Sequence, residues 1–103
     1  MSEDWNQRVW ALVAAVPRGH VVSYSGVAAM LGFPRRARHV SRALKQAPDD
    51  LDLPWQRVIN AQGKIAFPPG SIQAGIQRTL LEEEGVVFGP GGKVAWSQFG
   101  WQP

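Results

Sequence analysis

The sequence predicts a small single domain of the α/β class, mixed α+β and mainly helical. Apolar residues recur at helical spacing, short apolar runs lie between turn signals, and the chain has only 103 residues. Two short helical segments are joined by a Gly-containing turn, and the second is basic, which is typical of a helix-turn-helix. We expect one domain over residues 1–103 with a winged helix-turn-helix-like core at about 23–46, an elbow at 54–58, short β-hairpins and a tail at 97–103.

The first segment is expected to be an amphipathic helix. It is predicted from Trp5 to about Val16, with Asp4 as its N-cap and Gln7 completing a capping box. Residues 20–22, which follow a Pro-Arg-Gly turn, are predicted to form a short β segment. One face of the helix is apolar and carries Trp5, Val9, Leu12, Val13 and Val16.

Two further helices make up the predicted helix-turn-helix. Ser23 is the expected N-cap of a helix from Tyr24 to about Leu31, which stops at Gly32. After a Phe-Pro turn, a third helix is predicted over residues 35–46. Its inner or contact face is expected to carry Ala37, Val40, Ala43 and Leu44.

The C-terminal half is expected to contain one more helix and two hairpins. The predicted hairpins are residues 57–60 with 64–67 and residues 86–88 with 93–96. Ser71 is expected to cap a helix that extends to about Glu84, with Ile72, Ile76 and Leu80 on one stripe. The helix ends in three glutamates, which the helix dipole disfavours, so at least one is expected to pair with a cation or a buried donor.

The charges are distributed unevenly along the chain. The formal net charge is +3, yet no Asp or Glu occurs between Trp5 and Pro48, and the later acids cluster at 49–52 and 82–84. Such one-sided basicity is typical of a phosphate-binding face, and the alternative is a solvated basic surface. The basic residues of the acid-free stretch are Arg8, Arg18, Arg35, Arg36, Arg38, Arg42 and Lys45.

Several classes of function are disfavoured by what the sequence lacks. It contains no cysteine, which removes disulfides, thiolate metal sites and a cysteine nucleophile. Its two histidines, His20 and His39, come without a carboxylate constellation, so neither a metal site nor a cofactor is expected. The chain has no run of about 18 apolar residues and no signal-peptide pattern. We therefore expect an intracellular protein that is neither secreted nor bound to a membrane.

The elbow at Pro54–Val58 is expected to present a large aromatic side chain. Proline fixes its own φ and disfavours a helical conformation at Leu53, so Trp55 should leave a rigid turn. An indole of this kind either fills a core or offers a stacking surface. These residues alone leave both interpretations open.

Several blocks of the sequence, taken in order, resemble one family. The blocks are Gly19–Tyr24, Val27–Pro34, Ala37–Val40, Pro54–Ile59 and Leu80–Gly85. Over nearly the whole chain they resemble the DNA-binding, active-site domain of the O6-alkylguanine-DNA alkyltransferases. In that family the cysteine of a Pro-Cys-His-Arg-Val motif takes the alkyl group from guanine. Here Trp55 stands at the cysteine position and Gln56 at the histidine position. The chain is therefore similar to the non-catalytic branch, the alkyltransferase-like proteins.

The resemblance implies binding without alkyl transfer. Direct dealkylation needs a thiolate activated by a neighbouring base, and the chain has no thiol. Glu84 matches the glutamate that ends the family's relay, but it has nothing to relay to and is expected to pair locally, with Arg57 as a candidate. No catalytic residue is therefore expected.

The resemblance also implies roles in DNA binding. Tyr24 matches the tyrosine that helps to rotate the 3′ phosphate of the target nucleotide, and Arg38 matches the arginine finger that replaces the extruded base. The residues alone also allow first-turn packing for Tyr24 and one phosphate contact among several for Arg38. The expected DNA-binding residues are Ser23, Tyr24, Arg35, Arg36, Ala37, Arg38, Ser41, Arg42 and Lys45. The expected lesion-pocket residues are Pro54, Trp55, Gln56, Arg57, Val58, Phe67 and Pro68.

The function that follows is damage recognition in duplex DNA. The protein is expected to act as a monomer that docks in the minor groove, flips O6-alkylguanine and holds it. The resemblance implies hand-over to nucleotide excision repair proteins, in the bacterial cytoplasm at the nucleoid or in a eukaryotic nucleus. Residues 66–71 replace the family's pocket loop, and Ala47 stands where an asparagine usually braces the helix-turn-helix. The alternative function is a sequence-specific helix-turn-helix transcriptional regulator.

Overall fold

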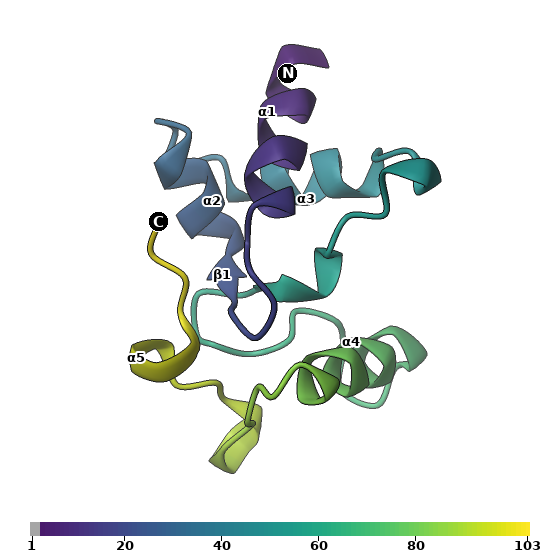
Figure 1. The fold of residues 1–103 in the computed structure, drawn as a ribbon, viewed down its shortest axis with the longest axis vertical. Coiled ribbons are helices and arrows are strands. Elements are labelled where there is room, and N and C mark those ends of the chain that lie inside the picture. The colour runs from purple at the N-terminus through teal and green to yellow at the C-terminus, as the bar shows by residue number, and fades with distance from the viewer. Residues whose placement is uncertain (1–2) are drawn as a thin grey trace.

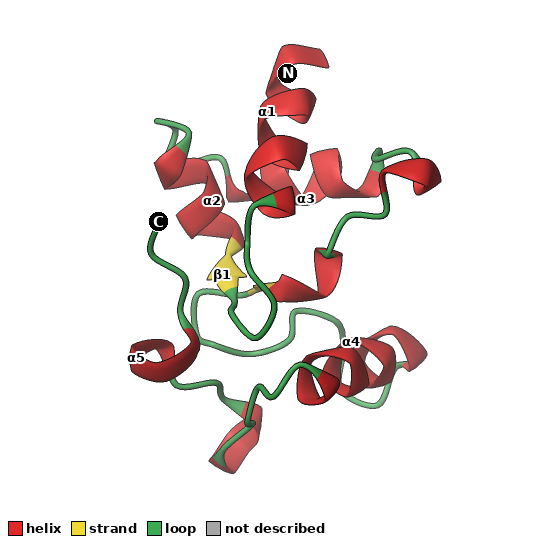
Figure 2. Ribbon diagram, viewed as in Figure 1, coloured by secondary structure: helices red, strands yellow, loops and turns green. Residues whose placement is uncertain are grey.

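The helices form two groups on either side of a short pair of strands. The computed structural model describes residues 3–103, so the first two residues of the expected domain lie outside it. α1, α2 and α3 lie together near the N-terminus, and α4 and α5 lie beyond the strands (Figure 1). Helices dominate the regular structure (Figure 2), which confirms the mixed, mainly helical class. The elements are α1 (Glu3–Ala14), β1 (Val22–Ser23), α2 (Tyr24–Met30), α3 (Ala37–Lys45), β2 (Val58–Ile59), α4 (Ile72–Glu83) and α5 (Trp96–Phe99), with 3-10 turns η1 (Asp49–Leu51), η2 (Trp55–Arg57) and η3 (Pro90–Gly92).

The strand pair divides the hydrophobic core in two. β1 and β2 are parallel, with Val22 opposite Val58. Because successive side chains of a strand point to opposite faces, Val22 and Val58 join one cluster while Val21 and Ile59 join the other. The first cluster is built by α1, α2 and α3, and the second by α4 and the C-terminal segment. The elbow that follows α3 therefore lies where the two halves of the molecule meet.

The first predicted hairpin is wrong. Residues 57–60 and 64–67 form no strand ladder: β2 pairs with β1, and the backbone hydrogen bond between the two segments, from the Asn60 N–H to the Lys64 carbonyl at 2.9 Å, closes a turn. The Asn60 side chain accepts hydrogen bonds from the Gln62 and Lys64 N–H groups at 3.0 and 2.9 Å. These donors are thus satisfied inside a tight turn, and the chain after Lys64 leaves the strands as an irregular loop.

The second predicted hairpin is present in a minimal form. Phe88 and Val94 make one antiparallel bridge across the Gly-rich turn. The chain then forms α5, so Trp96 begins a helix and does not extend the strand as predicted. The tail lies along β1, because the Trp101 N–H donates to the Val21 carbonyl at 2.8 Å and the Val21 N–H donates to Phe99 at 2.9 Å.

Helix boundaries follow the caps more closely than the apolar pattern. Ser23 caps α2 and Ser71 caps α4, as predicted, through hydrogen bonds to their side-chain oxygens of 2.8 and 3.2 Å. α1 begins before Asp4, so this residue lies in the first turn, where the helix dipole favours an acid, and is not the N-cap. The Arg36 N–H donates to the Phe33 carbonyl at 3.0 Å, and this turn delays the start of α3 to Ala37.

The predicted apolar stripe of α4 does not face the core. Ile72 is 80% exposed and Ile76 is 49% exposed, whereas Gln77 and Leu81 are buried. α4 is therefore rotated so that a polar amide, together with Leu81, points inward. The contacts of that amide, described below, account for the rotation.

Candidate nucleic-acid interface

The elbow holds Trp55 in a fixed, half-open position. Pro54 has φ −77° and ψ 62°, and the Trp55 N–H donates to the Leu53 carbonyl at 2.8 Å, which closes an inverse γ-turn. Trp55 then begins η2. Its side chain is 36% exposed and meets the Phe67 ring edge to face, with centroids 6.2 Å apart and planes at 85°. The indole therefore belongs to an open aromatic wall and not to either core cluster.

Trp55 lines a hollow of about 510 Å³ between α3 and the loop after β2. The helix-turn-helix contributes Tyr24, Ala37, Arg38, Ser41, Leu44 and Lys45 to its lining. Trp55 and the loop residues Ala66, Phe67 and Pro68 complete the lining. Segments far apart in the sequence thus meet around one opening, and a hollow of this size can receive a planar aromatic group.

Tyr24 reaches this hollow from the first turn of α2. Its N-terminal neighbour Ser23 accepts a hydrogen bond from the Gly26 N–H, and Tyr24 also packs against the first core cluster. Burial raises the pKa of the Tyr24 hydroxyl, so it stays protonated at neutral pH and can donate to a phosphate oxygen. First-turn packing and a role at the opening are therefore compatible.

α3 turns one face to the hollow and the opposite face to the core. Val40 and Ala43 are buried, while Ala37, Arg38 and Ser41 line the opening. Small side chains on that face allow a nucleic-acid backbone to approach closely.

The bracing of α3 comes from α1. The Trp5 indole donates to the His39 carbonyl at 3.2 Å, and the Trp10 indole donates to Ala43 at 2.8 Å. These contacts supply support that Ala47, which has no polar side chain, cannot give. The sequence analysis placed Trp5 on the core face but missed both hydrogen bonds.

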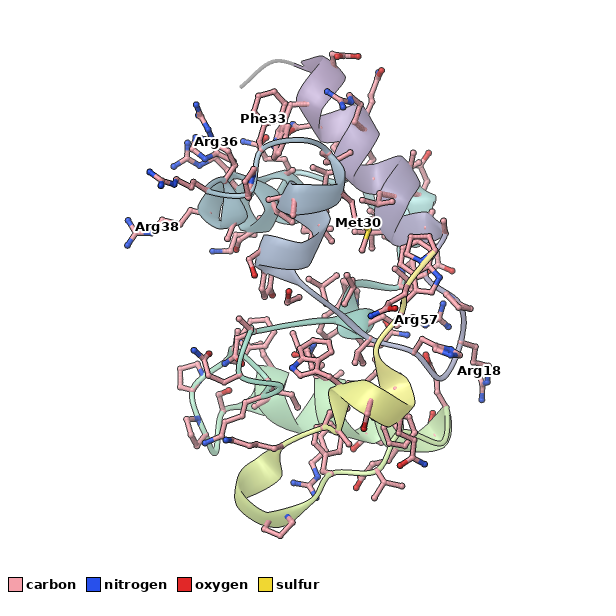
Figure 3. All side chains as sticks on the ribbon, turned by 90° about the vertical axis from the view of Figure 1, so that its left-hand side faces the viewer. Arg18, Met30, Phe33, Arg36, Arg38 and Arg57 are labelled. Carbon is pink, nitrogen blue, oxygen red and sulfur yellow. The ribbon has the colours of Figure 1, made fainter. Side chains whose placement is uncertain are left out.

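The basic residues around α3 are exposed and available to an anion. In Figure 3, Arg36 and Arg38 project outward from the same side of the molecule, and Arg18 lies on the other side. Arg38 and Lys45 line the hollow, whereas Arg35, Arg36 and Arg42 lie outside its lining. Among residues 3–103, none of these cations forms an ion pair with an acid. Their charge is therefore unneutralised within the described chain.

Glu84 ties the back of the elbow to the rest of the protein. Its carboxylate accepts hydrogen bonds from Gly19 N–H at 2.9 Å, Gln56 Nε2 at 2.8 Å and Arg57 at 2.9 and 3.1 Å. Arg57 also donates to the Val16 carbonyl at 2.8 Å. Burial alone would raise the pKa of Glu84, but the hydrogen bonds from Arg57, Gly19 and Gln56 and the Arg57 charge together hold it below its ordinary value. The predicted local pairing with Arg57 is confirmed.

Gln77 supports the elbow backbone, a contact that the sequence pattern did not predict. It is 1% exposed, and its Nε2 donates to the Gln56 carbonyl at 2.9 Å and to the Val58 carbonyl at 3.0 Å. α4 thereby holds the elbow backbone on both sides of Arg57. Its position four residues before Leu81, on the same helix face, is the sequence feature that could have indicated its burial.

Four of the expected pocket residues do not line the hollow. Val58 is fully buried in the first core cluster, because the strand pairing turns its side chain inward. Gln56 and Arg57 point toward Glu84, and with Pro54 they border a different hollow behind the elbow. Only Trp55, Phe67 and Pro68 of the predicted pocket set lie at the opening.

No helix within residues 3–103 has both the length and the apolar character needed to cross a bilayer. The same residues contain no group of three or more His, Asp or Glu side chains placed to hold a metal ion.

Comparisons with known proteins point to one family. The family model described as "6-O-methylguanine DNA methyltransferase, DNA binding domain" matches residues 4–86. The chain is 39% identical over 99 residues to the "DNA base-flipping protein" of Escherichia coli, covering 96% of this chain and 75% of that protein. It is 38% identical over 84 residues to "Alkyltransferase-like protein 1" of Schizosaccharomyces pombe, covering 82% of this chain and 78% of that protein.

A solved structure extends the comparison to the fold. The crystal structure of Schizosaccharomyces pombe Atl1 in complex with damaged DNA containing O6-carboxymethylguanine is similar to this chain with a TM-score of 0.87. The sequence identity is 31%, and the match covers 100% of this chain and 99% of that chain. The helix-turn-helix, the elbow and the C-terminal helices therefore follow one shared arrangement.

Proposed function

This chain belongs to the family of the 6-O-methylguanine DNA methyltransferase DNA-binding domain, and we propose that it binds duplex DNA, flips O6-alkylguanine into the hollow at Trp55 and holds it there without alkyl transfer. One observation carries the proposal: an open aromatic wall faces a basic helix across a hollow that also receives Tyr24. Relatives named for base flipping, and a similar structure that holds damaged DNA, support it.

Docking begins with the charge on α3. Lys45 and the arginines at 35, 36 and 42 meet phosphates and release counterions, which gives an affinity that depends on salt but not on sequence. The small residues Ala37 and Ser41 let α3 enter the minor groove. The neutral Tyr24 hydroxyl donates to the phosphate next to the target nucleotide and helps to turn it outward.

Selectivity for the lesion arises from the balance of flipping costs. Extrusion of a base costs a few kcal/mol of stacking and pairing, and less when the base is damaged. An O6-alkyl group removes the N1 proton of guanine and weakens its pairing with cytosine. Arg38 fills the gap in the stack, and Trp55 packs against the flipped base, where such stacking contributes about 1–3 kcal/mol. An undamaged guanine could make the same contacts with Arg38 and Trp55, but the free energy needed to flip it is larger.

Alkyl transfer has no acceptor in this chain. The family reaction needs a thiolate and a base, but the chain has no cysteine, and Trp55 stands at the corresponding position. Gln56, at the position of the base, is neutral and donates to Glu84. Glu84 is already engaged by Arg57, so this site lacks a proton relay. The bound lesion is therefore not consumed, and the lifetime of the complex is set by its dissociation rate.

A persistent complex suits a protein that marks damage for others. We propose that it acts as a monomer inside the cell, at the bacterial nucleoid or in a nucleus, and that nucleotide excision repair proteins take over the marked lesion. The alternative of a sequence-specific regulator has less support. The cavity-facing side of α3 presents Ala37, Arg38, Ser41 and Lys45, which include no Asn or Gln to read an adenine edge.

The test is an affinity measurement on two matched duplexes. Fluorescence anisotropy is recorded with duplexes that differ only by O6-methylguanine in place of guanine. We expect the lesion duplex to bind at least about fivefold more tightly, because the weakened pairing lowers the flipping cost by about 1–3 kcal/mol. Arg38→Ala should weaken lesion binding by about tenfold or more, because no side chain then fills the gap that the flipped nucleotide leaves in the base stack.

Arg18→Ala is the matched control. Arg18 is an exposed arginine that lies on the other side of the molecule from Arg38 (Figure 3). Its replacement should change lesion affinity by less than about twofold, because charges beyond a Debye length are largely screened. Equal affinity for both duplexes would overturn the proposal. A strong preference for one undamaged sequence would favour the regulator.

A further inference from the structure

The outer face of α4 carries apolar side chains that the fold does not cover. Ile72 is 80% exposed and Ile76 is 49% exposed, and Leu80 is half-buried on the same stripe. Residues four apart lie one above the other on a helix, so the three form one continuous strip. None of them lines the hollow at Trp55, and the proposed DNA binding makes no use of them.

A shallow groove runs along this strip, and a glycine forms part of it. The groove is lined by Ile72, Gly75, Ile76, Thr79 and Leu80. A Cβ added to Gly75 would meet no other atom within 4 Å, and its backbone has no left-handed conformation. Glycine in a helix interior is destabilising relative to alanine, so neither packing nor geometry inside the protein requires it. Because Gly75 has no side chain, the groove stays open to close approach by another molecule.

Among the described residues, the charges at the border of the groove that form no ion pair are mainly acidic. Glu83 continues the stripe toward the C-terminus of α4, where the helix dipole is also negative. Leu80 also borders the neighbouring hollow, beside Asp52 and the 45%-exposed Leu51. Three cations lie nearby: Arg78 and Arg57 line neighbouring hollows and are paired with Glu82 and Glu84, and the Arg18 guanidinium donates to the Glu83 carbonyl at 3.0 Å. This face is thus apolar with a negative border, unlike the basic face of α3.

We propose that this groove docks a short amphipathic helix of a second protein, with apolar residues along one stripe and Lys or Arg beside it. Amphipathic helices bind such grooves through anchors at i, i+3, i+4 and i+7, and basic residues complement Glu83 and Asp52. The inference does not depend on DNA binding by the hollow at Trp55.

A second copy of this chain fits the groove less well. Its own α4 would bring the same Glu83 against an acidic border, and its basic α3 already buries its apolar face at Val40 and Ala43. The strip and groove also offer far fewer residues than the about 20–30 per side of a stable protein–protein interface. A single helix is an occupant of the right size and charge.

Isoleucine methyl NMR tests the proposal with an internal control. The chain has four isoleucines, of which Ile59 is fully buried and serves as the control, whereas Ile65 lines a neighbouring hollow that Gly75 also borders. The DNA-free protein, labelled on these methyls, is titrated with an amphipathic Leu/Lys helical peptide. Ile72 and Ile76 should shift while Ile59 does not. A Leu/Glu peptide of the same pattern should bind at least about tenfold more weakly, because like charges repel.

Substitutions at Gly75 separate docking from folding. Gly75→Ala should raise Tm by about 3–6 °C, because alanine favours the helix and meets no neighbour. Gly85→Ala is the matched control and should lower Tm, since Gly85 has φ +92°. Gly75→Leu should fill the groove and weaken binding of the Leu/Lys peptide by at least about tenfold, without lowering Tm.

Four outcomes would overturn the proposal. They are an absence of shifts at Ile72 and Ile76, equal binding of both peptides, unchanged peptide binding in Gly75→Leu, and a lower Tm in Gly75→Ala. Methyl shifts that depend on protein concentration without peptide, together with a doubled mass, would assign the groove to a second copy and overturn the stated partner.

Discussion

At Glu84, donors from three parts of the chain converge on one carboxylate. The Gly19 N–H, the Gln56 amide and the Arg57 guanidinium lie 2.8 to 3.1 Å from its oxygens, and the side chain is 4% exposed. A relay glutamate must exchange a proton with its neighbour. Here each neighbour donates to the ionised form, so the group is held as an anion and acts as a clamp behind Trp55.

Glu84→Gln should reveal this clamp as a pH-dependent loss of stability. Removal of the charge should lower the free energy of unfolding at pH 7 by about 2–4 kcal/mol, because Arg57 is left partly buried without its partner. The folded-state pKa of Glu84 is lowered, so its contribution is complete above the ordinary value of 4.5 and is lost as pH falls through the folded pKa. Urea denaturation from pH 7 to pH 3 should show that wild type and variant approach the same free energy of unfolding below about pH 4.5.

Glu82→Gln is the control for this measurement. Glu82 pairs with Arg78 at 3.3 Å, but both side chains are about half exposed, so its loss should cost less than about 0.5 kcal/mol. If the difference in unfolding free energy between wild type and Glu84→Gln stayed constant down to pH 3, the ionised carboxylate would not be what clamps the elbow.

Single residues were predictable where a motif or a cap pointed to them. Ser23 and Ser71 cap their helices, and Tyr24, Arg38 and Trp55 meet at one hollow. Val58 was misplaced because the motif names adjacent residues, whereas a strand sends alternate side chains to opposite faces.

Among the elements, α4 has the main role in holding the elbow. Gln77→Met keeps the side-chain volume but removes both hydrogen bonds to the elbow carbonyls. Stability should fall by about 1–2 kcal/mol, since one buried and one partly buried acceptor lose their donor, while the Gln77 Oε1, which is buried without a hydrogen-bond partner, is removed as well. The preference for O6-methylguanine over guanine should fall by about fivefold or more, because a looser Trp55 forfeits part of a stacking energy of about 1–3 kcal/mol. Anisotropy with the two matched duplexes measures the preference.

Leu81→Ala is the control at this scale. It lies on the same buried face of α4 but belongs to the second core cluster and makes no hydrogen bond to the elbow. It should cost about 2–5 kcal/mol of stability and leave the lesion preference within about twofold, measured where both variants are folded. If both variants reduced the preference equally, Gln77 would be a core residue without a positioning role.

The elements that the sequence misassigned are those whose partners lie far away in the chain. β2 has two residues, too few for an alternation to reveal that it pairs with β1 and not with the segment that follows it. In α4 the apolar stripe was predicted without a partner, and the face that is buried carries Gln77, whose amide donates to the Gln56 and Val58 carbonyls. In both elements a tertiary contact decides what the local pattern leaves open.

In the whole molecule, the proposed site lies where two halves meet. One core cluster supports the helix-turn-helix, the other supports α4 and the C-terminal segment, and the elbow crosses between them. The charges are divided in a similar way: the α3 region is basic, while the turn after it and the end of α4 are acidic. This division predicts that DNA will meet only one face, and that α4 stays accessible to a second protein.

Salt dependence tests that division of charge. With about four cations near α3 placed to meet phosphates, the logarithm of the affinity for undamaged duplex should fall against the logarithm of the salt concentration with a slope of about −3.6. Arg36→Ala and Arg42→Ala should each reduce the slope by about 1, whereas Arg18→Ala, on the other side of the molecule, should leave it unchanged. The lesion preference should stay within about twofold as salt rises, because stacking on Trp55 releases no counterions. Anisotropy titrations at several salt concentrations measure both quantities. A slope near zero, or an equal effect of Arg18→Ala, would mean that the DNA contact does not lie on α3.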